Sequence, residues 1–368
     1  MTDFHSSKLR HLIFDECKLT EFLSFENRQG IFKAVDGRYK FAVTTLTKDS
    51  ISTDKPINSS FKAFFYKQDL SALHNESEKL NYPIKLVLAD AELYSLVEPR
   101  NKNEFELFQK IRLSFPSLAE SRMLTLSNDF NGTSDIEHIH PLIQGEVPVY
   151  EGKLMEQFVL RKKAERSVIE EEVIKKVGNE YKNWRIGIRK VGRSNDRRTL
   201  IATILPPFST ATENLHLQRI QGNQTISDRV YILGLLNSYN IDFVLRQIIT
   251  MNVNLFYLKQ LPIPSADEFP YSDEITKLSK SLLKKNGKPY DELDKLLQDE
   301  GVENPTEFDA LSLEILTAEL NARVVLGFKL TREEVINLMK TFESANHKQA
   351  VQAEAQRIID VYDRLSGE

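Results

Sequence analysis

The chain is poor in several patterns that define common protein classes. Its 368 residues include one cysteine, Cys17, which excludes an internal disulfide and a cysteine-rich zinc site and suits a reducing compartment. No apolar run approaches the roughly 20 residues that span a bilayer. The segment from Met1 to Arg10 is polar and charged and lacks the apolar core of a signal peptide. We therefore expect a cytoplasmic protein without a membrane partner.

Glycine-rich loops are also missing. No two of the 14 glycines lie closer than five positions apart, so no Gly-x-Gly loop exists to cradle a dinucleotide or the carboxylate of S-adenosylmethionine. Gly187 and Gly192, followed by Arg193 and Ser194, have the spacing of a phosphate-binding P-loop with arginine in place of lysine. A P-loop needs a helix at this point. The next residues, 195–198 (NDRR), favour a turn, and we do not predict nucleotide binding.

Hydrophobic and β-branched patterns predict a mixed α/β (α+β) fold. Strands are expected at residues 22–25, 41–46, 61–66, 184–188 and 200–205, and helices at residues 105–112, 162–177 and 230–247. Residues 265–314 hold thirteen carboxylates against six lysines and are expected to be helical, as is a segment that begins near Thr331. Phe328, Leu330 and Val335 are expected in the core of this helical region.

The most distinctive local feature is the basic segment 182–198 (KNWRIGIRKVGRSNDRR). The net charge of the chain is -4, yet this segment carries seven basic side chains against one carboxylate, around the single tryptophan. Such a segment is able to neutralise phosphates, and arginine and asparagine can address guanine and adenine in the major groove. The alternative is a solvated charged strand and turn. The candidate DNA-binding residues are Lys153, Lys182, Trp184, Arg185, Arg189, Lys190, Arg193, Asn195, Arg197 and Arg198.

Two weaker patterns concern metals. Asp135 with Glu151 and Lys153 fits the acid–acid–lysine pattern of metal-dependent nucleases, in which two carboxylates hold magnesium. His138 and His140 are spaced to share one face of a strand, but no third ligand lies within reach in the sequence. The nuclease pattern is short and occurs by chance in many charged sequences, and the two histidines fit better as ordinary loop residues. We predict no metal site and keep the nuclease as an alternative.

The order of several segments resembles the C-terminal part of the TaqI-like adenine-N6 DNA methyltransferases, including the type IIG fused restriction–methylation enzymes with their specificity domain. The segments that carry the resemblance are residues 25–28 (FENR), 31–32, 38–42 (RYKFA), 150–153 (YEGK), 185–189, 193–199 (RSNDRRT), 201–202, Pro206, 236–238 (LNS), 242–243, 260–262 (QLP), 318–322 (AELNA) and 330–334 (LTREE). Each segment is short, but together they span nearly the whole chain in the family's order.

One departure from the family is decisive for activity. The family's catalytic motif is Asn/Asp-Pro-Pro-Tyr/Phe, which holds the flipped adenine. This chain has only residues 205–208 (LPPF), without the Asn or Asp, and its one Asn-Pro, Asn304-Pro305, precedes threonine. No catalytic residue is therefore predicted. S-adenosylmethionine is expected only in a complete enzyme and not in this chain.

The resemblance implies three regions. Residues 1–95 would be the C-terminal remnant of a Rossmann-like methyltransferase domain, residues 96–264 a DNA target-recognition domain, and residues 265–368 a helical region that braces it. A partial sheet would expose unpaired edge groups and apolar side chains such as Phe41, Val43 and Phe64. We therefore expect either a partner that supplies the catalytic half or poor stability.

Three functions follow from these patterns. The first is recognition of double-stranded DNA as the specificity part of a restriction–modification system. The second is an enzyme: a methyltransferase whose catalytic half comes in trans, or a nuclease that uses Asp135, Glu151 and Lys153. The third is an anti-restriction protein that occupies a methyltransferase partner and has no DNA affinity of its own.

Overall fold

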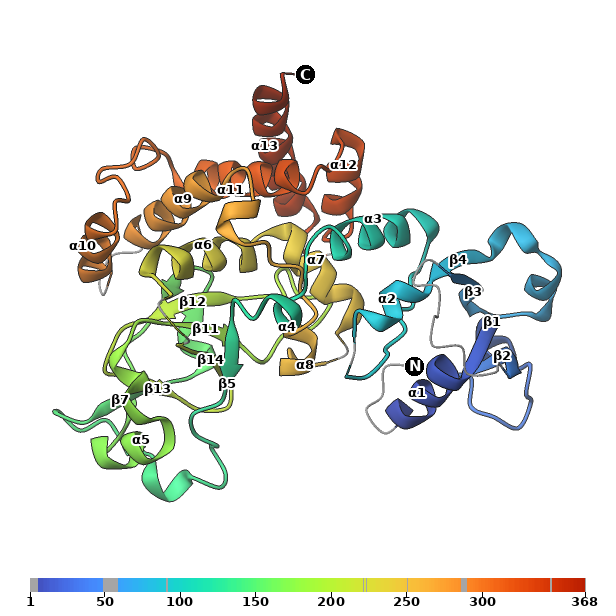
Figure 1. Cartoon of the computed structure of the whole chain (residues 1–368), viewed down its shortest axis with the longest axis horizontal. Helices are drawn as coiled ribbons and strands as arrows, with labels where there is room; N and C mark the ends of the chain where they lie inside the picture. The colour runs from blue at the N-terminus through green and yellow to red at the C-terminus, as the bar shows by residue number, and fades with distance from the viewer. Residues whose placement is uncertain are drawn as a thin grey trace. The chain divides into compact units, whose positions relative to one another are not determined.

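The computed structural model describes residues 6–48, 59–90, 92–220, 222, 224–249, 251–285, 290–344 and 346–367. The fold is mixed α/β, as predicted (Figure 1). The chain divides into two compact units, Met1–Leu113 and Ser114–Glu368, here called unit 1 and unit 2. None of the helices in the described ranges is both long enough and apolar enough to cross a membrane.

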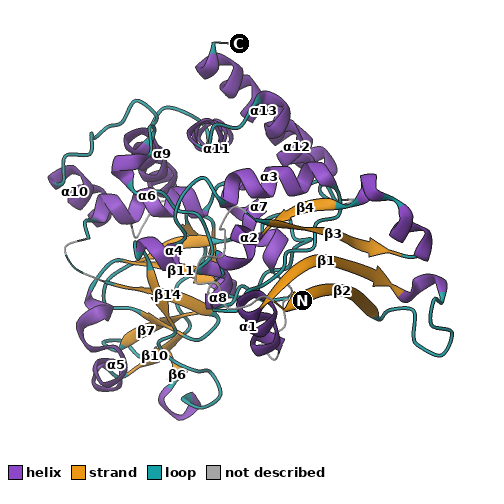
Figure 2. Ribbon diagram, turned by 45° about the vertical axis from the view of Figure 1, so that its right-hand side comes forward, coloured by secondary structure: helices purple, strands orange, loops and turns teal. Residues whose placement is uncertain are grey.

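Unit 1 is built on a four-stranded sheet. Its elements are α1 (Ser7–Glu16), β1 (Cys17–Glu26), β2 (Lys40–Lys48), β3 (Ser60–Lys67), β4 (Leu80–Pro83), α2 (Ile84–Leu88) and α3 (Lys102–Arg112). The strand order is β2-β1-β3-β4, with β1 antiparallel to β2 and parallel to β3 (Figure 2). The three strands predicted in this region and the helix predicted at residues 105–112 are confirmed.

The core of unit 1 is aromatic. Phe61 stacks on Tyr82 at a centroid distance of 4.9 Å, and Tyr82 contacts the Phe105 ring of α3 at 5.0 Å. Phe64, which we expected to be exposed, is buried and meets Phe25 edge to face at 5.1 Å. That expectation was wrong because β3 is an inner strand, with β1 on one side and β4 on the other.

Strand β2 fits the expectation of an exposed edge. It has only one neighbouring strand among the described residues. Eight of its nine positions are exposed, and Val43 is 45% exposed, whereas Phe41 is half-buried because it stacks on Phe25 at 5.1 Å. Charges stand only at its two ends, Lys40 and Lys48. A long edge strand without an interior charge or proline is a ready template for another strand.

Unit 2 carries two four-stranded sheets and a hairpin. The strands are β5 (Thr125–Ser127), β6 (His140–Pro141), β7 (Val147–Tyr150), β8 (Met155–Glu156), β9 (Val159–Leu160), β10 (Arg166–Val168), β11 (Arg185–Arg189), β12 (Ala202–Leu205), β13 (Thr210–Ala211) and β14 (Leu215–Arg219). One sheet has the order β12-β11-β14-β5 and is antiparallel, the other has the order β13-β7-β10-β6, and β8 pairs with β9. Both strands predicted in this region are confirmed.

Helices form the rest of unit 2. They are α4 (Leu118–Ser121), α5 (Glu170–Val177), α6 (Ile226–Leu236), α7 (Tyr239–Ile248), α8 (Leu255–Leu258), α9 (Ser272–Lys285), α10 (Asp291–Asp299), α11 (Leu313–Gly327), α12 (Arg332–Lys340) and α13 (Lys348–Ser366). Thr331 begins α12 with a capping box to Glu334, as predicted. Phe328, Leu330 and Val335 are buried, also as predicted.

Two helix predictions need correction. The helix expected at residues 162–177 starts only at Glu170, because Arg166–Val168 is strand β10 in the second sheet. The helix expected at residues 230–247 is two helices, since Ser238 caps α7 by accepting a hydrogen bond from the Ile241 N–H. The side chain of Asn237, at the break, pairs with both backbone groups of Ala202 on β12 at 3.0 Å.

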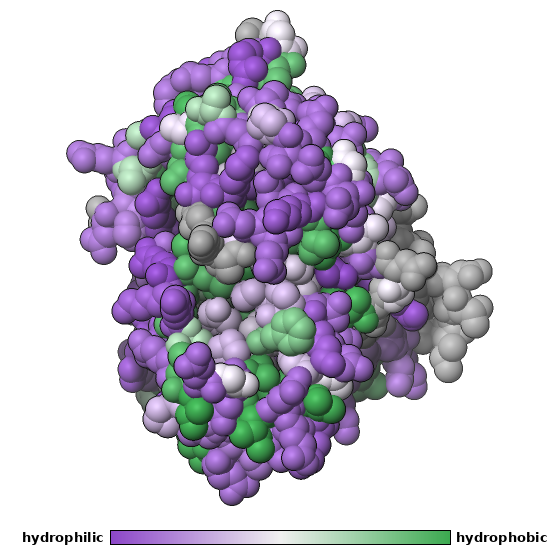
Figure 3. All heavy atoms as spheres, turned by 90° about the vertical axis from the view of Figure 1, so that its left-hand side faces the viewer, coloured by the Kyte–Doolittle hydropathy of each residue, from purple (hydrophilic) through white to green (hydrophobic). Residues whose placement is uncertain are grey.

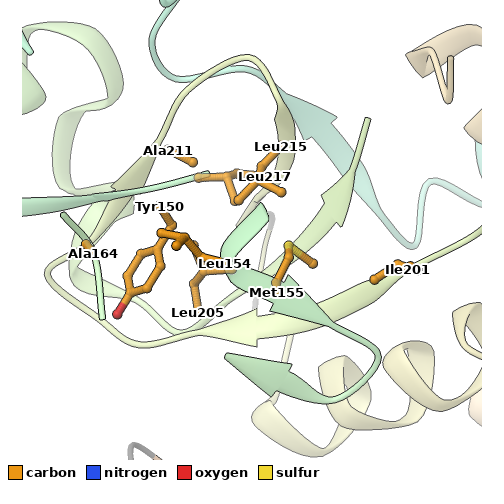
Figure 4. Close-up of a cluster of buried hydrophobic side chains, with 9 residues drawn as sticks. All are labelled: Tyr150, Leu154, Met155, Ala164, Ile201, Leu205, Ala211, Leu215 and Leu217. Carbon is orange, nitrogen blue, oxygen red and sulfur yellow. The ribbon is translucent and has the colours of Figure 1, made fainter. Parts of the chain in front are cut away.

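A hydrophobic cluster joins the two sheets of unit 2 to the β8–β9 hairpin (Figure 4). Its members are Tyr150, Leu154, Met155, Ala164, Ile201, Leu205, Ala211, Leu215 and Leu217. Burying a leucine-sized side chain contributes roughly 1.5–3 kcal/mol. The cluster therefore anchors two segments: residues 150–164, and the end of the connection between β11 and β12 at Ile201.

Candidate nucleic-acid interface

The basic segment is β11 followed by the connection to β12, and its first half is part of the protein core. Arg185 is buried and donates to the buried Asp129 at 2.9 Å and to the Ser209 carbonyl at 2.8 Å. Asp129 also accepts a hydrogen bond from Thr210 Oγ1 at 2.8 Å. Trp184 is buried as well. Because these two side chains lie in the core, Trp184 and Arg185 position the strand rather than reach a partner, which corrects their assignment as contacts.

The second half, residues 190–201, is a connection held from inside by Asp242 of α7. The fully buried Asp242 carboxylate accepts from Arg198 Nε at 2.8 Å and from the Thr199 and Leu200 backbone amides at 3.2 Å each. The Arg246 guanidinium lies 3.6 Å from the same carboxylate. Two buried cations and two backbone donors thus converge on one anion, which is the condition for a buried charge to be tolerated.

Arg198 belongs to this frame. Its guanidinium lies 4.1 Å from the centroid of the Tyr239 ring and donates to the Asn237 carbonyl at 2.7 Å. Burial lowers the pKa of Arg198, but the charges and hydrogen bonds of Asp242, Tyr239 and Glu354 together outweigh that effect and raise it. Arg198 is therefore a fixed structural cation, and its assignment as a direct contact is corrected for the same reason as that of Arg185.

The tip of the connection is exposed and ordered. Arg193, Asn195 and Arg197 are all exposed. The Arg193 N–H donates to Asp196 Oδ2 at 2.9 Å, and Thr199 Oγ1 donates to the Arg193 carbonyl at 2.7 Å. These contacts close the turn, so the side chains at its tip are presented on a rigid backbone.

Arg197 has an acidic partner, while Arg193 has none among the described residues. Arg197 lies 3.2 Å from Glu354 of α13, which also accepts from the Tyr239 hydroxyl at 2.6 Å. A cavity of about 570 Å³ lies beside this pair, between the connection, the β8–β9 hairpin and the helices α11 and α13. Its charged lining is balanced, with Arg189, Arg197 and Arg198 facing Glu156, Asp196 and Glu354. This balance does not favour a strongly charged ligand inside the cavity itself.

The fold brings Lys153 to the same side as Arg189. A Cβ on Gly152 would lie 3.0 Å from Arg189 Cγ, so the backbone before Lys153 touches the Arg189 side chain. Lys153 is exposed and pairs with Glu151 at 3.0 Å, a hydrogen bond that raises the pKa of Lys153. Lys153 and Arg189 are far apart in sequence. The hydrophobic cluster holds the segment that carries Lys153, because Leu154 and Met155 belong to it.

Three further cations were missed by sequence reasoning. Arg161 pairs with Glu156, one of the residues that line the cavity with Arg189. Lys162 and Lys163 follow, both exposed and without an acidic partner among the described residues. The run of three basic residues was visible in the sequence, but we assigned Lys162 and Lys163 to a charged helix. We call the exposed cations of residues 153–163 and of the connection, together with the half-buried Arg189 and Lys190, the basic face; the exposed members are Lys153, Arg161, Lys162, Lys163, Arg193 and Arg197.

Lys182 lies apart from the basic face. It precedes β11, while Lys190 follows it, so a strand of five residues, about 16 Å long, separates the two. Its ammonium group is 5.6 Å from the centroid of the Tyr181 ring. The segment that is continuous in sequence is therefore divided in space by its own strand.

The metal alternatives gain no support. No group of three or more His, Cys, Asp or Glu side chains within the described ranges is arranged to hold a metal ion. Asp135 accepts from the Asn131 N–H at 2.8 Å and from Lys176 at 2.7 Å, and these contacts lower its pKa. His138 and His140 each lie beside glutamates, His140 at 3.2 Å from Glu146.

The glycine spacing of a P-loop does not correspond to a phosphate loop. Gly187 lies within β11, where a Cβ would meet Leu205 Cδ1 at 2.5 Å. Gly192 lies against the Thr199 carbonyl, whose oxygen would be 2.7 Å from a Cβ at this position, and a turn follows instead of a helix. The segment is a strand and a closed turn, so it lacks the strand–loop–helix form that holds phosphate.

The glycines of unit 1 do not form a Gly-x-Gly loop. Its two glycines, Gly30 and Gly37, lie in the loop between β1 and β2. The buried Asn27 side chain fills that loop, accepting from the Phe32 N–H at 2.8 Å and donating to the Val35 carbonyl at 2.7 Å. The FENR motif thus closes this loop around the Asn27 side chain.

Comparisons with known proteins find a distant structural similarity. No family model matches the chain, and no curated protein matches it in sequence. Among solved structures, the type IIG restriction endonuclease BpuSI is similar to this chain with a TM-score of 0.36 and 12% sequence identity. The similarity covers 98% of this chain, which spans 45% of the length of that protein. At this TM-score the similarity does not define a shared fold.

Proposed function

We propose that this chain recognises double-stranded DNA as the specificity part of a restriction–modification adenine-N6 methyltransferase. The observation that carries the proposal is the closed turn at residues 193–197, which is buttressed by the buried Asp242. Its Arg197 lines the same cavity as Arg189, and the Arg189 side chain touches Gly152, next to Lys153. Two segments far apart in sequence thereby form one basic face on a protein of net charge -4.

The role of each residue in the basic face depends on whether its side chain already has an acidic partner. Lys162, Lys163, Lys190 and Arg193 have no acidic partner in the described part of the chain, so phosphate can pair with them without breaking an ion pair. Phosphate contacts give affinity and register but no sequence information. Asn195, exposed at the tip of the turn, is the candidate for a paired hydrogen bond to adenine.

The test is selection of bound duplexes from a randomised DNA pool at two salt concentrations, followed by sequencing. We expect an enriched motif whose binding weakens as salt rises. Lys162→Ala with Lys163→Ala should weaken binding to all sequences and reduce the slope of log K against log salt by up to about 1.8. Asn195→Ala should instead relax the preference at one base pair, by about 1–3 kcal/mol.

The matched control replaces two exposed lysines far along the chain. Lys340 and Lys348 also lack an acidic partner within the described ranges and lie in the C-terminal helices. Their double alanine variant should leave the salt slope unchanged. A control variant that lowers the slope as much as the Lys162 and Lys163 variant would show charge-driven binding without a defined face, and an absence of any salt-sensitive binding would overturn the proposal.

We further propose that unit 1 docks a catalytic methyltransferase part along β2. The support is the long uncharged interior of this edge strand and its exposed Val43. Methyl transfer would then come from the partner, which is also where S-adenosylmethionine would bind. The test is co-purification with a candidate catalytic half: Val43→Lys should abolish the complex, whereas Lys85→Ala, on α2, should leave it intact.

A further inference from the structure

The connection between β6 and β7 in unit 2 presents two aliphatic side chains to solvent. Leu142 is 49% exposed and Ile143 is 53% exposed. Their backbone is held in place: the Leu142 N–H donates to the Glu165 carbonyl at 3.0 Å, and the Ile143 N–H donates to Ser167 Oγ at 2.9 Å. The side chains therefore project from a fixed turn. Apolar side chains exposed together beside a cavity are candidates for an interaction site.

These side chains form one wall of a second cavity, of about 740 Å³. The opposite wall is residues 160–164, which contribute Leu160, Arg161, Lys162 and Lys163. The one carboxylate in the lining, Glu146, is already engaged, since Ser167 Oγ donates to it at 2.8 Å and His140 Nε2 lies at 3.2 Å. Apolar side chains thus face Lys162 and Lys163, which have no acidic partner among the described residues, and Arg161, which pairs with Glu156.

The cavity and the basic face share residues. Arg161, Lys162 and Lys163 belong to both, and Tyr150 and Ala164 anchor the cavity on the hydrophobic cluster that also carries Ile201 (Figure 4). Figure 3 shows hydrophobic residues reaching the surface between hydrophilic ones on the face that looks out from the left of Figure 1. The arrangement suits a partner that is apolar in the middle and anionic at its margins.

We propose that Leu142 and Ile143 act as a wedge that enters the DNA duplex at one base step. Stacked bases are the apolar interior of a polyanion, and leucine and isoleucine are among the side chains that proteins insert between base steps. Lys162 and Lys163 would hold the phosphates beside the opened step. The inference rests on the proposed recognition of DNA and adds a way to read sequence without base hydrogen bonds.

The wedge predicts which sequences are preferred. Unstacking costs least at pyrimidine–purine steps such as TA and CA, which bend easily. A duplex opened at such a step is kinked, by about 20–90° in proteins that insert apolar side chains. The selected motif should therefore contain a pyrimidine–purine step at a position where no polar side chain of the turn at residues 193–197 makes contact.

The experiment uses the full chain and a duplex of about 30 base pairs that carries the motif selected by the wild type. Donor and acceptor dyes at its ends report bending, and 2-aminopurine at the pyrimidine–purine step reports unstacking. The wild type should shorten the end-to-end distance and raise 2-aminopurine fluorescence. Leu142→Ser with Ile143→Ser should abolish both signals, lower affinity for the motif about tenfold and leave affinity for a random duplex unchanged.

The control is Ile174→Ser, which removes an exposed isoleucine from α5, and it should behave as the wild type. All three proteins should melt at the same temperature, because the substituted side chains are exposed. Binding by the wild type without bending or unstacking would overturn the wedge and leave DNA recognition standing. The wedge would also be overturned if the wild type and the double variant gave equal bending and unstacking signals. The same holds if Ile174→Ser lost these signals as fully as the double variant. A wild type that binds no duplex would remove the proposed function itself.

Discussion

The buried carboxylate of Asp242 provides the sharpest test of how the basic face is built. Asp242→Asn keeps the shape of the side chain and retains Oδ1, which accepts from the Thr199 and Leu200 amides. In the wild type, Arg198 Nε lies 2.8 Å from the Asp242 carboxylate. The variant places an amide N–H against this donor and removes the negative charge that faces Arg246. Removing one partner of a buried ion pair costs about 3–5 kcal/mol, so we expect a loss of that size in the free energy of unfolding, measured by urea denaturation.

A second readout locates the damage. The turn at residues 193–197 should loosen when its anchor is lost, and trypsin should then cut after Arg193, Arg197 or Arg198 faster than elsewhere. Combining Asp242→Asn with Arg198→Met should cost less than the sum of the two single changes, because the unpaired cation is removed together with its partner. Mass spectrometry of the first fragments identifies the cleaved bonds.

The matched control is an ion pair of similar geometry in an exposed place. Arg332 and Asp363 lie 2.9 Å apart, with side chains 47% and 29% exposed. Asp363→Asn should cost no more than about 1 kcal/mol. The reasoning is refuted if Asp242→Asn costs as little as this control, or if the two variants show the same trypsin pattern.

Two further predictions concern stability. Gly192→Ala should cost about 1–3 kcal/mol in urea denaturation, because the new Cβ would meet the Thr199 carbonyl at 2.7 Å, whereas Ser194→Ala at the exposed tip should be neutral. For Asp309, hydrogen bonds from Lys284, Ser281 and Thr306 outweigh burial and lower the pKa from 3.8 to about 2. The contribution of Asp309 to the stability of the folded protein is complete above pH 3.8 and is lost as the pH falls toward 2. The reason is that the carboxyl is protonated at a higher pH in the unfolded chain than in the folded protein. Asp309→Asn should therefore be less stable than the wild type at pH 7, with a difference that shrinks at pH 3.

Local patterns in the sequence predicted most strands and several helices because each depends on neighbours in the chain. The runs at residues 41–46 and 61–66 are apolar and β-branched, and both are strands. The break at Asn237 was not predictable in this way. An apolar helix pattern continues through it, and the interruption comes from a pairing with Ala202, which lies 35 positions earlier in the sequence.

The candidate site shows the same limit more strongly. Arg185 and Arg193 look alike in the sequence, as members of one basic segment. The fold separates them, because Asp129 draws Arg185 into the core while Arg193 stands at an exposed turn. Which cation meets an acid depends on contacts made across 56 positions in the case of Arg185, and no local pattern records such a contact.

Pairing, more than total charge, decides where a polyanion can bind this protein. A cation that already has a buried acid would have to give up that partner, at a cost of several kcal/mol, before it could meet a phosphate. Arg185 and Arg198 are in this position. Lys162, Lys163 and Arg193 give up only solvent and salt ions, whose release favours binding at low ionic strength. A chain with net charge -4 can therefore offer a specific basic face, provided that its acids are committed elsewhere.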